Sequence, residues 1–332
     1  MGRQLFLRIV DALGNRYSYF HHRNDTTRRD PLSSIQKCTT AMRILAYGIA
    51  GDAVDKYVRL AGTTTLKSLK KFVRGVIEIF GDEYLRRPTP DGIQRILQVN
   101  EARGFPGMIG SIDCMHWPWD KCPVAWHGQY TRGDQGVPTI ILEAVASYDL
   151  WIWHAYFGVA GSNNDINVLD RSPVFNQFLE GQNPYVQFSV NGTSYNMGYY
   201  LADGIYPEWP VFVKTIHRSN LLSEKRKLFA RYQESARKDI ERTFGVLKKR
   251  FAIIATPVRL WKKCEVGDIM KACIILHNMI IEDERDDNTL VNNVQFDVSD
   301  NSRSIPEFET GLIPNYYANR DRFFANHTPL RN

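Results

Sequence analysis

Apolar and polar positions change their spacing along the chain, and this change separates regions of different secondary structure. Up to about residue 100, apolar residues recur at three- and four-residue steps, which is typical of amphipathic helices. Ser33 can cap a helix that ends near Gly48, and a short helix is expected from Asp52. After a polar turn, a third helix is expected from about Leu66 to Phe80. The front of the chain is therefore predicted to be helical.

From residue 101 onward, short apolar runs replace the helical period. The runs MIGSIDCMHW, PTIILEAVASYD and LWIWHAYFGVAG predict three consecutive strands, and GYYLADG predicts another. TIILEAVA is apolar on both faces, which indicates a strand covered by helices on both sides. A long helix follows, whose apolar stripe consists of Phe229, Tyr232, Ala236, Ile240, Phe244, Leu247 and Phe251. This order predicts an α+β fold of the ribonuclease H kind, a mixed sheet flanked by helices.

Three regions follow from these patterns: helical residues 1–100, a ribonuclease H-like domain at 101–282, and an acidic, partly flexible tail at 283–332. A short helix, a polar turn and a basic helix are the pattern of a helix-turn-helix unit, whose second helix enters the major groove of DNA. The outward positions of that basic helix are Lys67, Lys70, Lys71 and Arg74. Periodicity alone fits a plain three-helix packing domain equally well.

Charge is distributed unevenly between these regions. Residues 1–100 carry 17 Lys/Arg and 9 Asp/Glu, residues 101–281 carry 20 and 17, and residues 282–332 carry 5 and 10, for a total of +6. A basic front joined to a near-neutral middle suits a protein that neutralises phosphates. Ordinary solvated lysines would give the same numbers.

Three carboxylates stand where predicted elements can aim them at one point. Asp113 ends an apolar strand, Asp203 ends a second, and Glu241 lies beside the stripe of the long helix. Oxygen ligands suit Mg²⁺ or Mn²⁺, and two such ions serve phosphoryl displacement by activating a water and stabilising the leaving oxygen. Alone, Asp203 before a glycine reads as a turn residue, and Glu241 reads as the partner of Arg237 or Lys238. Asp113 is expected to be largely buried, where a lone carboxylate needs a partner.

Further residues extend or compete with this site. Asp165 follows the third strand and is either an additional metal ligand or a helix N-terminal carboxylate. Lys248, Lys249 and Arg250 lie beyond Glu241 and either contact a DNA backbone or solvate the helix end. A zinc site from Cys114, His116, Cys122 and His127 matches no common zinc spacing, and His116 is expected to support the acidic site instead. His277, on an apolar helix, is expected to be a hydrogen-bonded core residue.

Other classes of protein are disfavoured by the sequence. Five cysteines without a CxxC motif indicate reduced thiols in the cytosol or nucleus rather than a disulfide framework. The longest apolar stretch is interrupted by Glu143, Asp149 and His154, so no membrane span is expected. No secretory signal is recognised, so the Asn191-Gly192-Thr193 sequon is expected to be unused.

Five strings, in order, carry a resemblance to a known family: GFPGMIGSIDCMHWPW, TIILEAVASYDLWIWHAYFGVAGSNNDINVL, YYLADGIYP, ARKDIERTFGVLKKRFAII and CIILHNMIIEDER. Together they resemble the plant branch of the PIF/Harbinger transposases. The resemblance implies a ribonuclease H-like domain with a DDE acidic triad at Asp113, Asp203 and Glu241. It also implies that Asp165, which with Asn164 matches the family's Asn-Asp signature, is a metal or near-metal residue.

The resemblance further implies what the chain acts on. A DDE transposase uses two Mg²⁺ or Mn²⁺ ions to hydrolyse phosphodiester bonds of double-stranded DNA and to transfer the 3′ ends. Family members work in the nucleus beside a separate Myb-like DNA-binding protein, which can also import them from the cytoplasm, and a homo-oligomer is compatible with the sequence. The alternative is a domesticated descendant that binds DNA or chromatin without cutting.

Overall fold

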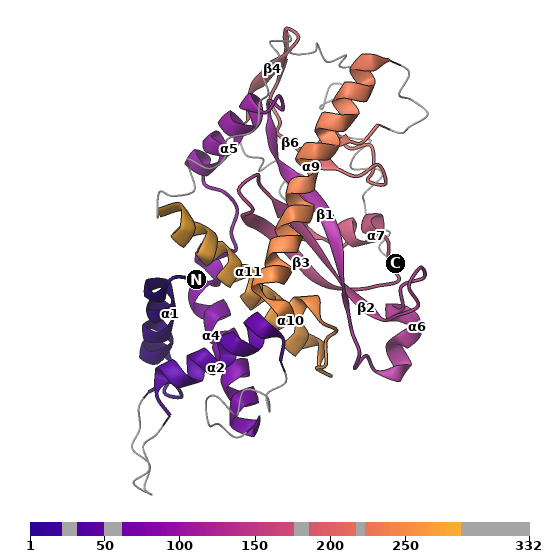
Figure 1. The fold of residues 1–332 in the computed structure, drawn as a ribbon. Coiled ribbons are helices and arrows are strands. Elements are labelled where there is room, and N and C mark those ends of the chain that lie inside the picture. The colour runs from indigo at the N-terminus through magenta and orange to yellow at the C-terminus, as the bar shows by residue number, and fades with distance from the viewer. Residues whose placement is uncertain (22–31, 50–61, 176–185, 217–222, 287–332) are drawn as a thin grey trace, which may run out of the picture.

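A computed structural model of the chain describes residues 1–21, 32–49, 62–175, 186–216 and 223–286. Helices occupy the described chain up to residue 102, the strands lie between residues 108 and 214, and the long helices α9 and α11 follow them (Figure 1). The helices are α1 (Arg3–Arg16), α2 (Ser34–Tyr47), α4 (Gly62–Tyr84), α5 (Pro90–Ala102), α6 (His127–Tyr130), α7 (Asp165–Leu169), α9 (Glu224–Arg250), α10 (Ala252–Ala255) and α11 (Lys263–Asp286). The strands are β1 (Met108–Pro118), β2 (Thr139–Ala146), β3 (Ile152–Ala160), β4 (Phe188–Val190), β5 (Thr193–Tyr195), β6 (Tyr199–Ala202) and β7 (Phe212–Lys214).

The central sheet has five strands in the order β3-β2-β1-β6-β7. β1, β2 and β3 form an antiparallel meander, whereas β6 pairs parallel with β1 and β7 pairs parallel with β6. β4 and β5 form a separate hairpin. A mixed five-stranded sheet flanked by helices is compatible with the predicted ribonuclease H-like fold, and the α+β class is confirmed.

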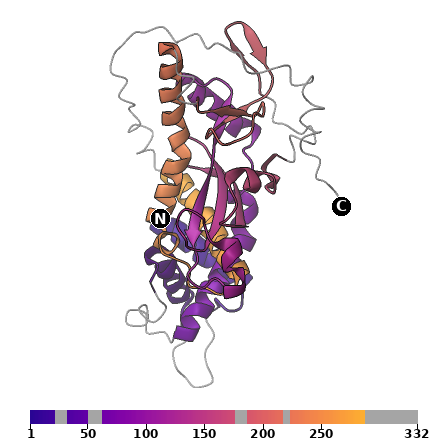
Figure 2. The ribbon, with the colours of Figure 1, turned by 90° about the vertical axis from the view of Figure 1, so that its right-hand side faces the viewer.

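Both faces of the sheet are covered, as the apolar character of β2 predicts. Every residue of β2 is buried. Leu142 and Ala144 point into a core shared with α9 and α11, while Ile141 points the other way, toward Val168 of α7. Figure 2 shows α9 standing along one side of the sheet. The two faces therefore present different chemical surroundings to neighbouring residues of β1.

α2 begins and ends where the sequence predicts. Ser33 caps α2 by accepting a hydrogen bond from the backbone N–H of Gln36, whose side chain accepts one from the Ser33 N–H in return. Gly48 follows α2 with a left-handed φ of 63°, and a Cβ at this position would stand 2.9 Å from the Ala252 carbonyl oxygen. The short helix expected from Asp52 lies outside the described residues.

α4 is longer than expected and is packed on several sides. It lies against α11 and α2, and its buried residues share one core cluster with the sheet and with α11. Helical spacing places Ile35, Leu66 and Tyr232 among the inward apolar positions of their helices, but they are 50%, 45% and 52% exposed, so this expectation is wrong. Each lies at the border of its helix's apolar stripe, where the helix surface turns away from its neighbours.

The predicted tail falls largely outside the described residues. α11 continues to Asp286, so the first residues assigned to the tail are helical. Among the described helices, none has both the length and the apolar composition that crossing a membrane would require.

Candidate active site

The prediction that Asp113 ends its strand is wrong, because β1 continues through Trp117 to Pro118. Asp113 lies near the middle of β1, on the sheet face that α9 covers. Its side chain is 19% exposed, and one carboxylate oxygen accepts a hydrogen bond from the backbone N–H of Cys114 at 2.8 Å. Burial raises the pKa of Asp113 to about 6, while the Cys114 N–H and the Arg237 guanidinium act in the opposite direction. The expectation of a buried carboxylate in need of a partner is therefore met by the structure.

Arg237 is that partner, and it is shared with Glu241. Its guanidinium stands 3.6 Å from Asp113 Oδ2 and 3.0 Å from Glu241 Oε1, with Glu241 one helical turn along α9. The Arg237 side chain is 13% exposed, and its Nε has no hydrogen-bond partner among the described residues. The pairing of Glu241 with Arg237, the simpler of the two interpretations of Glu241, is thus present and also connects Glu241 to Asp113.

Asp203 is the first residue after β6. It is exposed, and its Oδ1 accepts a hydrogen bond from the Gly204 N–H at 2.6 Å, so it has the turn geometry expected of Asp-Gly. The register of the parallel pair places Ser111 of β1 beside Leu201 of β6. Asp113 comes two residues after Ser111, and Asp203 comes two residues after Leu201. The two aspartates therefore stand at the same level along the strand direction.

Asp165 approaches β1 from the opposite face. It is the first residue of α7, whose N-cap Asn164 accepts a hydrogen bond from the Asn167 N–H. Asp165 is half-buried, and burial raises its pKa against a hydrogen bond from the Cys114 thiol. Cys114 and Asp113 are neighbours on one strand, so their side chains leave opposite faces of the sheet. Asp165 is separated from Arg237 and Glu241 by the strand itself.

The four carboxylates nevertheless interact through their charges. Asp165 and Glu241 both raise the pKa of Asp113, and Asp203 raises the pKa of Asp165. Within the described residues, no three His, Cys, Asp or Glu side chains are arranged so that they could hold a metal ion. The oxygen donors suit a hard cation chemically, whereas their present spacing, with Arg237 between two of them, does not form a cage.

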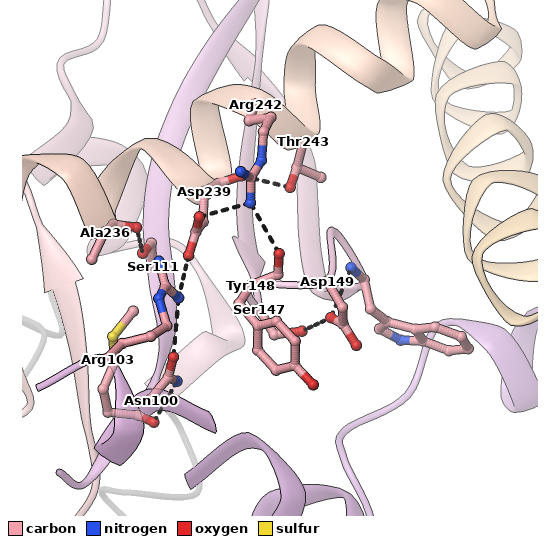
Figure 3. A network of polar contacts seen from close by, with 12 residues as sticks. Asn100, Arg103, Ser111, Ser147, Tyr148, Asp149, Ala236, Asp239, Arg242 and Thr243 are labelled. Carbon is pink, nitrogen blue, oxygen red and sulfur yellow. Dashed lines mark hydrogen bonds and ion pairs between the residues drawn. The ribbon is translucent and has the colours of Figure 1, made fainter. Parts of the chain in front are cut away.

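The position of α9 on the sheet is fixed by a buried polar network on its other flank (Figure 3). Asp239 of α9, 4% exposed, pairs with Arg103 at 2.7 Å and with Arg242 at 2.9 Å. Arg103 also donates to Asn100 at the end of α5, and Arg242 donates to the Tyr148 carbonyl between β2 and β3. Asp239 therefore ties α9 to α5 and to the sheet, which sets where Arg237 and Glu241 stand.

The predicted DNA-binding residues of α4 all have intramolecular partners. Lys70 pairs with Glu265 at 2.7 Å and Arg74 with Asp268 at 3.6 Å, both on α11. Lys67 and Lys71 lie over the ring of Tyr19. Their charges are thus partly used within the chain, and DNA binding by α4 stays a prediction.

At the end of α9, the predicted basic residues differ from one another. Arg250 pairs with Glu284 and also contacts His277 at 3.3 Å, so it holds α9 to α11. Lys249 is exposed and Lys248 is half-buried, with no ion pair to another described residue. Their contact with DNA is likewise a prediction.

The histidines considered for other roles have hydrogen-bond partners outside the four carboxylates. The His116 ring is hydrogen-bonded to Thr139 at 2.8 Å and His127 to the Cys122 carbonyl at 3.0 Å. His277 is fully buried, its Nε2 lies 2.8 Å from the Leu150 carbonyl oxygen, and burial lowers its pKa to about 4. His277 is thus the hydrogen-bonded core residue that the sequence predicts, and the four proposed zinc ligands form no metal cluster in the described chain.

Sequence reasoning missed one buried acid near the site. Glu143 on β2 pairs in register with Cys114 and is fully buried. It accepts a hydrogen bond from the Ser172 hydroxyl, and its second oxygen has no partner among the described residues. The apolar run TIILEAVA contained the signal, because one glutamate inside an otherwise buried strand is unusual.

Comparison with known proteins places this arrangement in an evolutionary context. Over residues 82–288, the sequence matches the model of a family described as plant transposon protein. This range contains every strand of the sheet and all four carboxylates. The chain matches no curated protein and no protein of solved structure.

Proposed function

Because the chain belongs to the plant transposon protein family, we propose that it is a DDE-type DNA transposase or endonuclease of the PIF/Harbinger kind. The observation that carries the proposal is the position of Asp113. It is a largely buried carboxylate on the central strand of a mixed sheet. It stands level with Asp203, the first residue after the adjacent parallel strand, and one arginine bridges it to Glu241. The charges of Asp165 and Glu241 both act on Asp113, and Arg237 offsets them only in part.

In this proposal Asp113, Asp203 and Glu241 hold divalent metal, Mg²⁺ or Mn²⁺, with Asp165 as an additional or nearby ligand. When bound, two such ions supply charge neutralisation and an activated water for hydrolysis of a phosphodiester bond. The chain's own residues provide the positions: β1 and β6 fix the two aspartates, and the Asp239 network fixes the helix that carries Glu241. Arg237 has to release at least one carboxylate before that carboxylate can bind an ion.

The substrate in this proposal is double-stranded DNA, whose freed 3′ ends are transferred to a target. A nuclear location and cooperation with a separate Myb-like DNA-binding protein belong to the same proposal, because the described residues do not include a complete helix-turn-helix. Residues 50–61, which connect α2 to α4, lie outside the described residues.

A second candidate is a domesticated descendant that binds DNA or chromatin without cutting. The observation that favours it is the pairing of Arg237 with two of the proposed ligands, which leaves no formed metal cluster in the described residues. A chain that no longer uses metal could keep this ion-paired arrangement permanently.

The experiment that separates the two is a cleavage assay on DNA carrying transposon terminal repeats, with Mg²⁺ or Mn²⁺. The natural chain is compared with Asp203→Asn and with Asp120→Asn, which makes the same charge change at another exposed position. Loss of several kcal/mol of transition-state stabilisation predicts that Asp203→Asn is slower by about a hundredfold or more. Equal rates in all three chains would reject the catalytic role of Asp203, and absence of cleavage in the natural chain would favour the second candidate.

A further inference from the structure

The solvent-facing side of α9 carries a stripe of basic and small residues that contains no acidic residue. Positions three or four residues apart lie on one face of a helix. On the side of α9 opposite its buried residues, these positions are Arg231, Ser235, Lys238, Arg242, Gly245 and Lys249, and all six are exposed. We refer to these six residues as the α9 crest. It contains four cationic residues, two small residues and no acid.

Most cations of the α9 crest lack an intramolecular partner, whereas Lys67, Lys70, Lys71 and Arg74 of α4 each have one. The side chains of Arg231, Lys238 and Lys249 have no hydrogen bond or ion pair with another described residue. Arg242 is held by Asp239 and the Tyr148 carbonyl, yet its side chain stays 56% exposed. As a whole, α9 has ten Lys/Arg and four Asp/Glu, and Asp239 is already neutralised by Arg103 from α5.

The geometry of the α9 crest suits an extended polyanion. Arg231 and Lys249 are 18 residues apart, which corresponds to about 27 Å at 1.5 Å per residue. This is the length of about eight base pairs at 3.4 Å each. Ser235 and Gly245 have small side chains, so a phosphate backbone could approach the helix closely between the long cationic side chains.

The α9 crest also passes beside the proposed active site. Glu241 lies next to Arg242 in sequence and projects about a quarter turn away from the crest around the helix axis. On this basis, and resting on the proposed function, we propose that the α9 crest holds the backbone of the DNA duplex next to the bond that is cut. The contacts are to phosphates, so they position the duplex without reading its sequence.

Binding can be measured without cleavage, by fluorescence anisotropy of a labelled duplex of about 30 base pairs in EDTA, between about 50 and 200 mM salt. The crest variant is Arg231→Gln/Lys238→Gln/Lys249→Gln. The matched control is Arg86→Gln/Lys121→Gln/Lys262→Gln, which removes the same charge at three exposed positions outside α9. Circular dichroism and thermal unfolding establish that both variants keep the fold.

The crest variant is expected to bind at least about tenfold more weakly at about 100 mM salt, and to lower the slope of log K against log salt by about 2 to 3, because each lost phosphate contact removes about 0.9. The control is expected to change the slope by less than about 1. Equal losses in both variants, or a larger loss in the control, would overturn the crest assignment while leaving the proposed function intact. Absence of DNA binding by the natural chain would overturn the crest assignment alone, because the proposed function also includes a separate Myb-like DNA-binding protein and is tested by the cleavage assay.

Discussion

Two acidic side chains on opposite flanks of α9 differ in the number of cations that face them. Asp239 and Glu241 are two residues apart and therefore project about 200° apart around the helix axis. Asp239 is buried between Arg103 and Arg242, at 2.7 and 2.9 Å. Glu241 and the nearby Asp113 share Arg237 at 3.0 and 3.6 Å. One flank has two arginines for one carboxylate, and the other has one arginine for two.

This difference separates a structural ion cluster from a candidate site for an external cation. At Asp239 the protein supplies all the positive charge that the carboxylate needs, although burial still raises its pKa. At Asp113 the neighbouring charges of Asp165 and Glu241 add to the effect of burial, and Arg237 offsets them only in part. An added divalent cation would therefore gain more at Asp113 than at Asp239.

The largest effect of this difference is expected on folding stability. Asp239→Asn leaves Arg103, whose side chain is 15% exposed, without its carboxylate, and is expected to lower the free energy of unfolding by about 3 kcal/mol. Asp113→Asn leaves Arg237 paired with Glu241 and removes a charge that burial disfavours, so it is not expected to lower the free energy of unfolding. Urea unfolding without divalent ions measures both. Equal losses of unfolding free energy in the two variants would show that the number of facing arginines does not distinguish the two flanks of α9.

A second effect concerns the pH dependence of stability. The pKa of Asp113 is raised to about 6 in the folded chain from an ordinary value of 3.8, so the folded state binds the proton more tightly than the unfolded state. This group therefore destabilises the fold as pH rises from about 4 to about 6, by at most about 3 kcal/mol, and the loss persists above that window.

Asp113→Asn is expected to remove this loss and to flatten the curve of unfolding free energy between about pH 4 and pH 6. Urea unfolding at a series of pH values, without divalent ions, measures it. Asp120→Asn, at an exposed position, serves as the control for the charge change. If Asp113→Asn and the natural chain gave parallel curves, the raised pKa of Asp113 would be disproved.

The smallest effect is expected on metal affinity. Arg237→Gln removes the cation that Asp113 and Glu241 share, and is expected to tighten Mn²⁺ binding by about fivefold, or about 1 kcal/mol. Isothermal titration calorimetry measures the affinity. Arg242→Gln on the opposite flank is the control and should leave it unchanged, because Asp239 retains Arg103. Weaker Mn²⁺ binding by Arg237→Gln would mean that the arginine holds the carboxylates in place for the ion.

Periodicity and turn chemistry predicted much of the fold. Ser33 and Gly48 correctly indicated the ends of α2, and the unbroken apolar character of TIILEAVA correctly indicated a strand with both faces covered. Two elements were missed although the signals were present. Thr89-Pro90, now the N-cap and first residue of α5, is a common helix start. Asn191-Gly192 joins β4 to β5 with φ of 51° and 78°, which is the usual chemistry of a two-residue hairpin.

For the candidate site, sequence reasoning named the carboxylates but could not place them. Arg237 was considered only as a local partner of Glu241, because its contact with Asp113 joins residues more than a hundred positions apart. The basic residues of α4 were predicted to face DNA, and only the packing of α11 shows that Glu265 and Asp268 stand opposite them. Glu143 was missed since its environment depends on α7 and the residues that follow it.

By itself the sequence determined the kinds of element and the chemical character of each surface, because local period, capping residues and charge act over a few residues. It also determined which carboxylates could serve a hard cation. The tertiary structure alone decided which charges meet: that Arg237 lies between Asp113 and Glu241, that Asp239 is enclosed by two arginines, and that the α9 crest remains exposed. Charge pairing depends on distances between elements, and these distances are set by how the helices pack on the sheet.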